Sequence, residues 1–372
     1  MSLTQNVKSY ALELGLQAVG ITSVEPFPQA EEVMVDRIKQ GLYAGLPWFT
    51  EGRAQLACQP ELLLPEARSI ISLAASYAGP EPEPPTVGGP WGRISRFALG
   101  EDYHHVLKKR LEALLRYVAD RSGAAQGRIF VDASPLPERA VARRAGLGWY
   151  GKSANIFVPE LGSWVFLAEV LTEAELEADA PLRKNCGRCD ICLRACPTGA
   201  LVAPYAVDSR RCTSYLTIEC RGSVPVELRA AMGDWVFGCD VCQEVCPVNR
   251  RARQPEESLI PAKESPYQPL RGLLGISEAE FAARFRRSPI KRAKRLGLRR
   301  NAAIALGNSG DRDAVPPLAC ALEDPEPLLR AHAAWALGRL GGRRAQAVLE
   351  RALAREGEVA VREEARWALE GA

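Results

Sequence analysis

This chain of 372 residues has few histidines and no long apolar runs. Only three histidines occur, which argues against a metal site built from imidazole ligands. No apolar run approaches the length of a membrane span, which predicts a protein without a membrane partner. The start, from Met1 to Tyr10, is polar and lacks the apolar core of a signal peptide. These absences exclude membrane-spanning proteins and give no sign of export.

Cysteine is abundant, with eleven residues, and most of them lie between Cys186 and Cys246. The run CGRCDICLRACP, which starts at Cys186, has the C-x2-C-x2-C-x3-C-P spacing of bacterial ferredoxins. A second half, CDVCQEVCP, starts at Cys239. Thiolates are soft ligands that hold iron–sulfur clusters, and the fourth cysteine of such a run binds the other cluster of a pair. The spacing therefore predicts two [4Fe–4S] clusters.

The order of the cysteines in the chain predicts two ligand sets. Cluster one takes Cys186, Cys189, Cys192 and Cys246. Cluster two takes Cys196, Cys239, Cys242 and Cys212, with Cys220 as the alternative in the last place. Zinc is the competing interpretation of C-x2-C pairs, but the two Cys-Pro endings favour clusters. Clusters and free thiols without an export signal indicate the reducing cytoplasm.

The periodicity of apolar residues predicts strands that alternate with helices over residues 1–175. The expected helices span 4–15, 30–42, 102–122 and 138–145. The expected strands span 18–21, 69–77, 128–131 and 163–171. This alternation is typical of an α/β or α+β domain, and the proline-rich segment 80–90 is expected to be a surface loop. A ferredoxin-like domain over 176–255 follows.

The C-terminal region, 256–372, contains an internal repeat. The Ala-rich segments NAAIALG, AHAAWALG and EARWALE share an Ala-Leu pair at 305, 336 and 368, which gives spacings of 31 and 32 residues. Such a unit cannot bury its apolar face alone, so neighbouring units stack into an α-solenoid that resembles HEAT repeats. The chain is thus expected to be an α+β multidomain protein.

Two segments carry candidate catalytic residues. In VDASPLPER, Asp132 follows a strand and precedes a proline-stiffened turn, where α/β domains present ligands. Asp132 or Ser134 is equally suited to cap the next helix. In SRFALGEDYHH, His104 and His105 stand at the head of a helix, either as polar helix-start residues or as the lining of a cofactor pocket. The glycines of GLGWYGK resemble a phosphate-binding loop only loosely.

The segment 284–300, RFRRSPIKRAKRLGLRR, has nine basic and no acidic residues in seventeen positions. A run of this kind is often a solvated face, but its density favours binding to a phosphate backbone. The predicted nucleic-acid contacts are Lys291, Arg292, Lys294, Arg295, Arg299 and Arg300.

Several motifs in a fixed order resemble the cobalamin-dependent epoxyqueuosine reductases: LLLPEARSII, RFALGEDYHHVL, VDASPLPERA, GLGWYGK, the two cysteine runs and SPIKRAKRLGLRRNAAIALGN. The resemblance implies a nitroreductase-like cobalamin-binding domain (1–175), a two-cluster ferredoxin domain and a HEAT-like domain that holds tRNA. It implies reduction of epoxyqueuosine to queuosine at the tRNA wobble position, the last step of queuosine biosynthesis. It assigns the missing cluster ligand to Cys212 and the catalytic acid to Asp132.

The resemblance also implies where cobalamin binds. Family members often have Arg-x-Asp-Pro before LLLP, where this chain has Leu-Ala-Cys-Gln-Pro, so the arginine contact falls to Arg53. The expected cofactor contacts are Arg53, Ser95, Asp132, Lys152, Ser153, Asp240 and Val241. The cofactor performs the difficult chemistry, while the protein supplies electrons, orientation and a proton.

Further partners and alternatives follow from the same resemblance. A separate reducing partner of flavodoxin or ferredoxin type is expected to supply electrons. A reductive dehalogenase-like enzyme that acts on a small molecule also joins cobalamin to two clusters, but it has no use for a basic solenoid. A simple electron-transfer ferredoxin would need only the cysteine region. Binding of cobalamin and of tRNA separates these three classes.

Overall fold

The computed structural model describes residues 2–80, 83–132, 135–255 and 259–371, and the chain forms two units. Unit 1 comprises Met1–Pro80, Gly100–Arg210 and Asp240–Ala262. Unit 2 comprises Glu81–Leu99, Arg211–Cys239 and Lys263–Ala372. This division differs from the three consecutive domains expected at 1–175, 176–255 and 256–372, because segments distant in sequence pair with each other within each unit.

A four-stranded antiparallel sheet with the order β1-β2-β7-β4 forms the centre of unit 1. Its strands are β1 (Ala18–Ser23), β2 (Ser69–Ser76), β7 (Val165–Thr172) and β4 (Gly127–Phe130). All eight residues of β2 are buried, as expected for a central strand with both faces covered. In the register, Ile70 pairs with Leu171 and Ser72 with Glu169, so these four side chains share one face.

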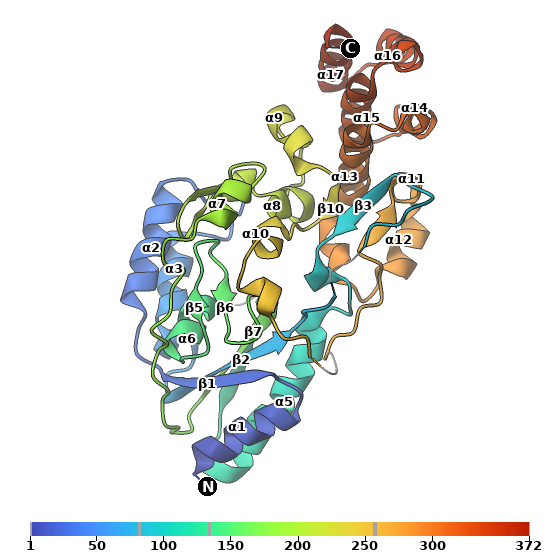
Figure 1. Ribbon diagram of the computed structural model, residues 1–372. Helices are drawn as coiled ribbons and strands as arrows, with labels where there is room; N and C mark the ends of the chain where they lie inside the picture. Colours follow the sequence, from blue (N-terminus) through green and yellow to red (C-terminus); the bar gives the residue numbers. More distant parts are fainter. Residues whose placement is uncertain (1, 81–82, 133–134, 256–258, 372) are drawn as a thin grey trace. The chain divides into compact units, whose positions relative to one another are not determined.

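Helix α6 (Glu138–Arg144) covers that face of the sheet, and Val141 and Ala142 pack against it. The approach is close: a Cβ at Gly20, in β1, would lie 2.2 Å from the carbonyl oxygen of Ala145. Helices α1 (Leu3–Glu13) and α5 (Tyr103–Ser122) contact each other, and Leu115 of α5 packs on the opposite face (Figure 1). Unit 1 therefore has helices on both faces of its sheet.

The remaining helices and strands of unit 1 are short, apart from α2 (Pro28–Lys39) with 12 residues. They are α2, α3 (Glu51–Cys58), α4 (Pro60–Leu63), β5 (Trp149–Tyr150), β6 (Ile156–Phe157), α7 (Ile191–Ala195), β8 (Leu201–Ala203), β9 (Ala206–Val207) and α10 (Val241–Glu244). The cysteine region contributes α7 and α10, which contact each other. This contact brings the two cysteine runs together within unit 1.

Unit 2 begins with a small sheet of three strands from distant parts of the chain. Strand β3 (Trp91–Ile94) pairs with β10 (Trp235–Phe237) in parallel and with β11 (Tyr267–Pro269) antiparallel. Its other short elements are α8 (Thr213–Ile218), α9 (Val226–Arg229), α11 (Leu270–Gly275) and α12 (Glu278–Arg284). Because these strands come from distant segments, the chain passes between unit 1 and unit 2 several times.

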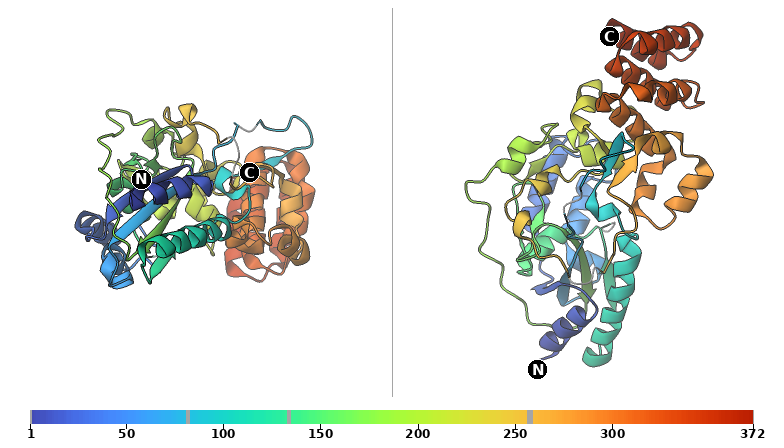
Figure 2. Two further views of the ribbon diagram at one scale, coloured as in Figure 1. Left: turned by 90° about the horizontal axis from the view of Figure 1, so that it is seen from below. Right: turned by 45° about the vertical axis from the view of Figure 1, so that its right-hand side comes forward.

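A two-layered helical stack completes unit 2 (Figures 1 and 2). One layer is α13 (Lys294–Ser309), α15 (Pro327–Leu340) and α17 (Val359–Glu370), and the other is α14 (Val315–Ala321) and α16 (Arg343–Arg355). The three Ala-rich segments lie in α13, α15 and α17, as predicted. A Cβ at Gly307 would lie 2.8 Å from the Cα of Ala336, and one at Gly338 would lie 2.7 Å from the Cα of Ala368. Small residues thus let successive repeats approach closely.

The expected helices and strands of residues 1–175 are present, with ends shifted by no more than a few residues. Part of the expected loop 80–90 lies outside the described residues. Among the described residues, none of the helices is both long enough and apolar enough to span a bilayer.

Candidate functional site

Asp132 follows the end of β4 and adopts a left-handed backbone conformation, with φ of 54°. Its carboxylate accepts the hydroxyl hydrogen of Tyr103, and its backbone N–H donates to the Glu138 carboxyl group. The N-cap residue of α6 is Pro137, without a side-chain capping bond. Asp132 is therefore not the cap of α6, and Ser134, the other cap candidate, lies outside the described residues.

Helix α5 brings two more side chains to Asp132. Asp102 caps this helix by accepting the backbone N–H of His104 at 3.1 Å, and its Oδ1 is also 2.7 Å from His104 Nδ1. The other ring nitrogen, Nε2, lies 3.7 Å from Asp132 Oδ2. Tyr103 stacks on the His104 ring with centroids 4.2 Å apart. Of the two histidines at this helix start, His105 is exposed.

Two acidic residues that the sequence interpretation missed lie under this loop. Glu169 in β7 is 0% exposed, and its Oε1 accepts the Ser72 hydroxyl hydrogen at 3.2 Å, while Oε2 has no hydrogen-bond partner in the described part of the chain. Burial and the nearby Glu138 raise the pKa of Glu169 well above its usual range. Burial and Asp132 raise the pKa of Glu138 to about 8. A lone acid in the apolar strand SWVFLAEVL was the available signal.

The hydrogen bond from Tyr103 to Asp132 has a fixed direction. Burial, and then the charge of Asp132, raise the pKa of Tyr103. The phenol therefore stays protonated, and its O–H group is the hydrogen-bond donor to the Asp132 carboxylate. One edge of the carboxylate is held in this way, while 62% of the Asp132 side chain stays exposed. The open edge is available to a reactant.

Four predicted cluster ligands surround one hollow in unit 1. Cys186, Cys189, Cys192 and Cys246 line it, together with Cys242, Phe157 and Pro247. Burial raises the pKa of Cys192, and the other three thiols raise it further, which is the electrostatic sign of their proximity. Convergence of cysteine sulfurs from one short loop and one distant position fits a four-iron cluster. Among the described residues, no group of three or more His, Cys, Asp or Glu side chains is arranged around a single metal ion.

The second predicted ligand set is divided between the units. Cys196 and Cys242 belong to unit 1, while Cys212 and Cys239 belong to unit 2. Within unit 1, the Cys196 sulfur lies 3.7 Å from the Thr198 hydroxyl, and the Cys242 sulfur lies 3.9 Å from Asn155 Nδ2. This second ligand set stays a prediction. Asn155 was not among the predicted site residues.

The predicted cofactor contacts occupy varied environments. Lys152 and Ser153 line the cysteine hollow, and Lys152 Nζ donates to the Gly187 carbonyl at 2.8 Å. Asp240 is buried before α10, which begins with the half-buried Val241. Arg53 is half-buried in α3, and Ser95 is buried in unit 2. Of these residues, Lys152 and Ser153 share the hollow with the cysteines of cluster one, while Asp240 and Val241 stand between Cys239 and Cys242 in the chain.

The glycines of GLGWYGK serve the packing of the chain itself. Gly146, Gly148 and Gly151 have G-x-G-x-x-G spacing, but they flank the hairpin β5–β6 instead of a strand followed by a helix. A Cβ at Gly151 would lie 2.0 Å from Cε2 of Phe157, and one at Gly148 would lie 2.5 Å from the Phe157 carbonyl oxygen. This segment is therefore not a dinucleotide-binding turn.

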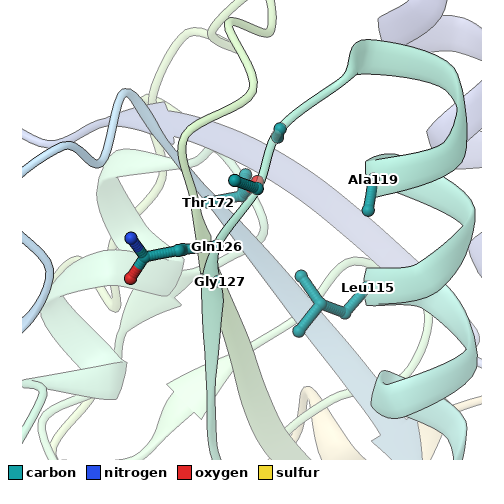
Figure 3. A pocket seen from close by; sticks show the side chains of 7 residues that line it. Leu115, Ala119, Gln126, Gly127 and Thr172 are labelled. Carbon is teal, nitrogen blue, oxygen red and sulfur yellow. The ribbon is translucent and has the colours of Figure 1, made fainter.

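A separate pocket lies at the start of β4 (Figure 3). Asp132, in contrast, follows the end of that strand. Leu115, Ala119, Gly127 and Thr172 line the pocket, and Gln126 points away from the α5 side chains (Figure 3). Its lining offers no titratable side chain and no cysteine. This pocket therefore has none of the chemistry of the Asp132 site.

The basic run in unit 2 is partly internal. Arg300 is 0% exposed and donates to the carbonyls of Leu216, Cys220 and Gly222. Arg299 is buried and pairs with Asp324 at 2.6 Å. The prediction that Arg299 and Arg300 contact nucleic acid is therefore wrong, because both guanidinium groups are used inside the fold.

The other predicted basic residues lie nearer the surface. Lys291, Arg292 and Lys294 are exposed, and Arg295 is half-buried. Two of them have acidic partners from elsewhere in unit 2: Arg292 pairs with Glu219 at 2.8 Å, and Arg295 pairs with Glu278 at 2.7 Å. Tertiary structure thus supplies the acids that the run itself lacks.

Three family profiles match separate parts of the chain. Residues 58–133 match "Epoxyqueuosine reductase QueG, DUF1730", residues 185–249 match a 4Fe-4S double cluster binding domain, and residues 292–370 match HEAT repeats. The epoxyqueuosine reductase of Escherichia coli K12 is 38% identical over 94% of this chain and 92% of its own length. The chain belongs to the epoxyqueuosine reductase family. The Bacillus cereus epoxyqueuosine reductase is 35% identical over 99% of this chain and 97% of its own length.

Solved epoxyqueuosine reductases share the fold. A selenomethionine-labelled epoxyqueuosine reductase and an epoxyqueuosine reductase with an epoxyqueuosine-modified tRNA-Tyr stem loop each superpose with a TM-score of 0.92 at 33% identity, covering 99% of this chain and 98% of theirs. The Bacillus subtilis enzyme, described with its catalytic aspartate loop swung out of the active site, has a TM-score of 0.90 at 33% identity, again covering 99% and 98%. The family members are oxidoreductases, and this chain has their iron–sulfur domain and HEAT repeats.

Proposed function

We propose that this chain reduces epoxyqueuosine to queuosine at the wobble position of tRNA, with two [4Fe–4S] clusters and cobalamin as cofactors. The observation that carries the proposal is the carboxyl group of Asp132, fixed on one edge by Tyr103 and open on the other. The solved relative with an epoxyqueuosine-modified tRNA stem loop supports the substrate. The relative with a swung-out catalytic aspartate loop supports Asp132 as the catalytic acid.

The cysteines supply the ligands of both clusters in this proposal. Cluster one is held by Cys186, Cys189, Cys192 and Cys246, whose shared hollow in unit 1 supports the assignment. Cluster two is held by Cys196, Cys212, Cys239 and Cys242. The Cys220 sulfur lies 3.6 Å from the carbonyl oxygen of Gly222 and 4.0 Å from that of Ser223. This contact favours Cys212 over Cys220 as the fourth ligand, because cluster ligands are thiolates.

Lys152 and Ser153 fit a second cofactor beside cluster one. They line the cysteine hollow with an amine and a hydroxyl group, which suit the polar periphery of a corrinoid. Cobalamin, when bound, supplies the low-potential redox chemistry at carbon that no side chain provides. The other proposed contacts are Arg53, Ser95, Asp132, Asp240 and Val241. Unit 1 is proposed to have the nitroreductase-like build that the family resemblance implies.

The side chains around Asp132 are proposed to deliver a proton to the departing oxygen. Removal of the epoxide oxygen leaves an oxygen atom that must be protonated before it departs as water. Asp132 is the proposed donor, because its carboxyl group has an open edge. Tyr103 keeps its own proton and orients Asp132, and Glu138 holds the Asp132 backbone through its N–H. An uncharged Glu138 also spares Asp132 the repulsion of a second carboxylate.

Binding of tRNA is proposed to use the exposed part of the basic run: Lys291, Arg292, Lys294 and Arg295. Phosphate groups attract such a patch without regard to sequence. A reducing partner of flavodoxin or ferredoxin type is proposed to supply the electrons, in the cytoplasm. The dehalogenase-like alternative is not favoured, because the relatives matched over more than nine tenths of this chain are epoxyqueuosine reductases.

The test is single-turnover conversion of epoxyqueuosine-containing tRNA by chemically reduced, fully loaded enzyme. Asp132→Asn keeps the shape but removes the transferable proton, so the rate should fall about a hundredfold to ten-thousandfold. Glu175→Gln, at an exposed acid of the same unit, is the matched control and should keep the full rate. Iron content and tRNA affinity should be unchanged in both variants. A near-normal rate for Asp132→Asn would refute the assignment of the acid.

A further inference from the structure

Three ionisable groups lie in a line at the start of α5. Asp102 Oδ1 is 2.7 Å from His104 Nδ1, and His104 Nε2 is 3.7 Å from Asp132 Oδ2. Asp102 is fixed because it also accepts the His104 backbone N–H, at 3.1 Å. A carboxylate on one ring nitrogen holds the proton there and turns the other nitrogen toward its partner. The arrangement therefore aims Nε2 at Asp132.

The reaction needs more protons than one carboxyl group holds. Converting the epoxide to an alkene breaks two C–O bonds and releases the oxygen as water, which takes two electrons and two protons. The reducing partner supplies the electrons, and a single carboxyl group can carry only one proton at a time. Tyr103 cannot supply the second, because burial and the Asp132 charge raise its pKa and keep its phenol protonated. A second proton has to reach Asp132 during each turnover.

His104 is placed to deliver that proton. Its side chain is 36% exposed, so the ring reaches solvent as well as Asp132. A substrate that reaches the open edge of Asp132 covers that edge and shuts off direct access of water. In the described part of the chain, Asp102 and Tyr103 lie against the imidazole from its own helix or beside it, and Asp132 faces it from the loop after β4. The carboxyl groups of Asp102 and Asp132 lie at the two ring nitrogens, where they can accept the N–H groups of an imidazolium.

We infer that His104, oriented by Asp102, re-protonates Asp132, so that one carboxyl group delivers both protons. The Nε2–H bond of the imidazolium breaks and an O–H bond forms at Asp132 Oδ2, the oxygen that also accepts the Tyr103 hydroxyl hydrogen. Rotation of the carboxyl group about its Cβ–Cγ bond then turns this O–H to the open edge, and the neutral ring takes a proton from water. The Nδ1–H stays hydrogen-bonded to Asp102 throughout. This inference rests on the proposed role of Asp132 as the acid, and it makes His104 a positioning and relay residue that does not touch the substrate.

The first test needs no turnover. The chain has only three histidines, so the ring C–H signals in a proton NMR titration are few enough to assign with His104→Gln and His105→Gln variants. Asp102→Asn and Asp132→Asn should each move the titration midpoint of His104 to lower pH, by about one unit, since each removes a negative charge beside the ring. Glu112→Gln, on α5, is the control and should leave the midpoint in place. If the titration midpoint of His104 is the same in Asp132→Asn as in the wild type, the inference is overturned.

The second test measures single-turnover rates of loaded His104→Gln against pH. We expect a loss of about tenfold or more at pH 8, a smaller loss at pH 6, and partial rescue at pH 8 by added imidazole, because a small acid can replace a relay. His105→Gln, whose position is exposed, should match the wild type. An unchanged rate, or an equal loss at every pH without rescue, overturns the relay. Failure of the proposed function is distinct, because it would show as a near-normal rate in Asp132→Asn.

Discussion

The two units bury charge in opposite ways. Unit 1 buries a carboxyl group, Glu169, which has one hydrogen bond and no cationic partner among the residues that the structure describes. Unit 2 buries the guanidinium groups of Arg229 and Arg300 almost completely and provides each with several acceptors. Arg229 lies 2.8 Å from Glu364, with side chains that are 1% and 8% exposed. A buried charge is tolerated when it is fully paired, and removing its partners is strongly destabilising, whereas a buried acid with a raised pKa is a candidate site for proton handling.

The units should also respond to pH in opposite directions. The pKa of Glu169 is raised by burial, so the folded unit 1 keeps a proton that the unfolded chain loses above about pH 4.5, and its stability falls as pH rises. Burial, followed by the charge of Arg229, lowers the pKa of His332 in unit 2. The unfolded chain then takes up a proton below about pH 6.5 that the folded unit refuses, so its stability falls as pH falls. A change of stability with pH that has opposite signs in the two units therefore cannot come from a general effect of pH on the whole protein.

The largest effect is expected from Arg300→Met. The change leaves the carbonyls of Leu216, Cys220 and Gly222 without their donor in a buried place. Each unsatisfied acceptor costs about 1–3 kcal/mol, so unit 2 should lose about 3–5 kcal/mol of unfolding free energy. Hydrogen exchange of α13 and α15 against denaturant measures it locally. Arg292→Met, at an exposed ion pair, should cost less than about 1 kcal/mol. Equal losses in both variants would remove the contrast between internal and surface parts of the basic run.

Glu169→Gln should flatten the pH dependence of unit 1. The wild-type protein should lose up to about 1.4 kcal/mol per pH unit from this group between pH 5 and 7, and the neutral amide removes that slope. Hydrogen exchange of β2 and β7, corrected for the intrinsic rate at each pH, provides the measurement. Glu175→Gln, at an exposed acid of the same unit, is the control. A wild-type slope that persists in Glu169→Gln would mean that Glu169 is charged in the folded state.

His332→Asn should act on unit 2 with the opposite sign. The neutral ring accepts the Val224 N–H at Nε2, at 3.2 Å, and its Nδ1 is 2.7 Å from the Leu328 carbonyl oxygen. Losing both bonds should cost about 1–2 kcal/mol at pH 8. The loss should be smaller at pH 5.5, since the wild type is weakened there while the variant is not. Urea unfolding at pH 8 and pH 5.5, followed by hydrogen exchange in α15, measures the loss of unfolding free energy at each pH. The same loss at both values would show that His332 is protonated when folded.

The smallest change in free energy is expected at the exposed end of the basic run. The double change Lys291→Glu and Lys294→Glu should leave stability unchanged, because both side chains are exposed. It should weaken tRNA binding and lower the salt slope of log affinity by about one for each lost phosphate contact. Arg312→Glu, an exposed site outside the run, serves as the control in a filter-binding salt titration. If tRNA affinity and its salt slope are unchanged, the basic run is a solvated face that does not bind tRNA.

The sequence by itself determined the features that depend on local spacing. The Cys-x2-Cys-x2-Cys loop predicted a cluster, and the hollow around Cys186, Cys192 and Cys246 agrees with that loop. Apolar periodicity predicted the helices and strands of residues 1–175, because side-chain burial repeats along each element. The Ala-Leu repeat predicted the stacked helices α13, α15 and α17 in the same way.

Only the tertiary structure decided which charged side chains are buried and which groups they pair with. Arg299 and Arg300 read as surface residues within a basic run, but Asp324 and the carbonyls of the α8 region enclose them. Glu169 became a buried acid because β2 and β4 flank its strand and α6 covers it. The free energy of a charge depends on neighbours that are far away in sequence, and no local pattern records them. Asp132 shows both sides: its sequence context marked it as a candidate, and the contacts of Tyr103, His104 and Glu138 gave it an orientation.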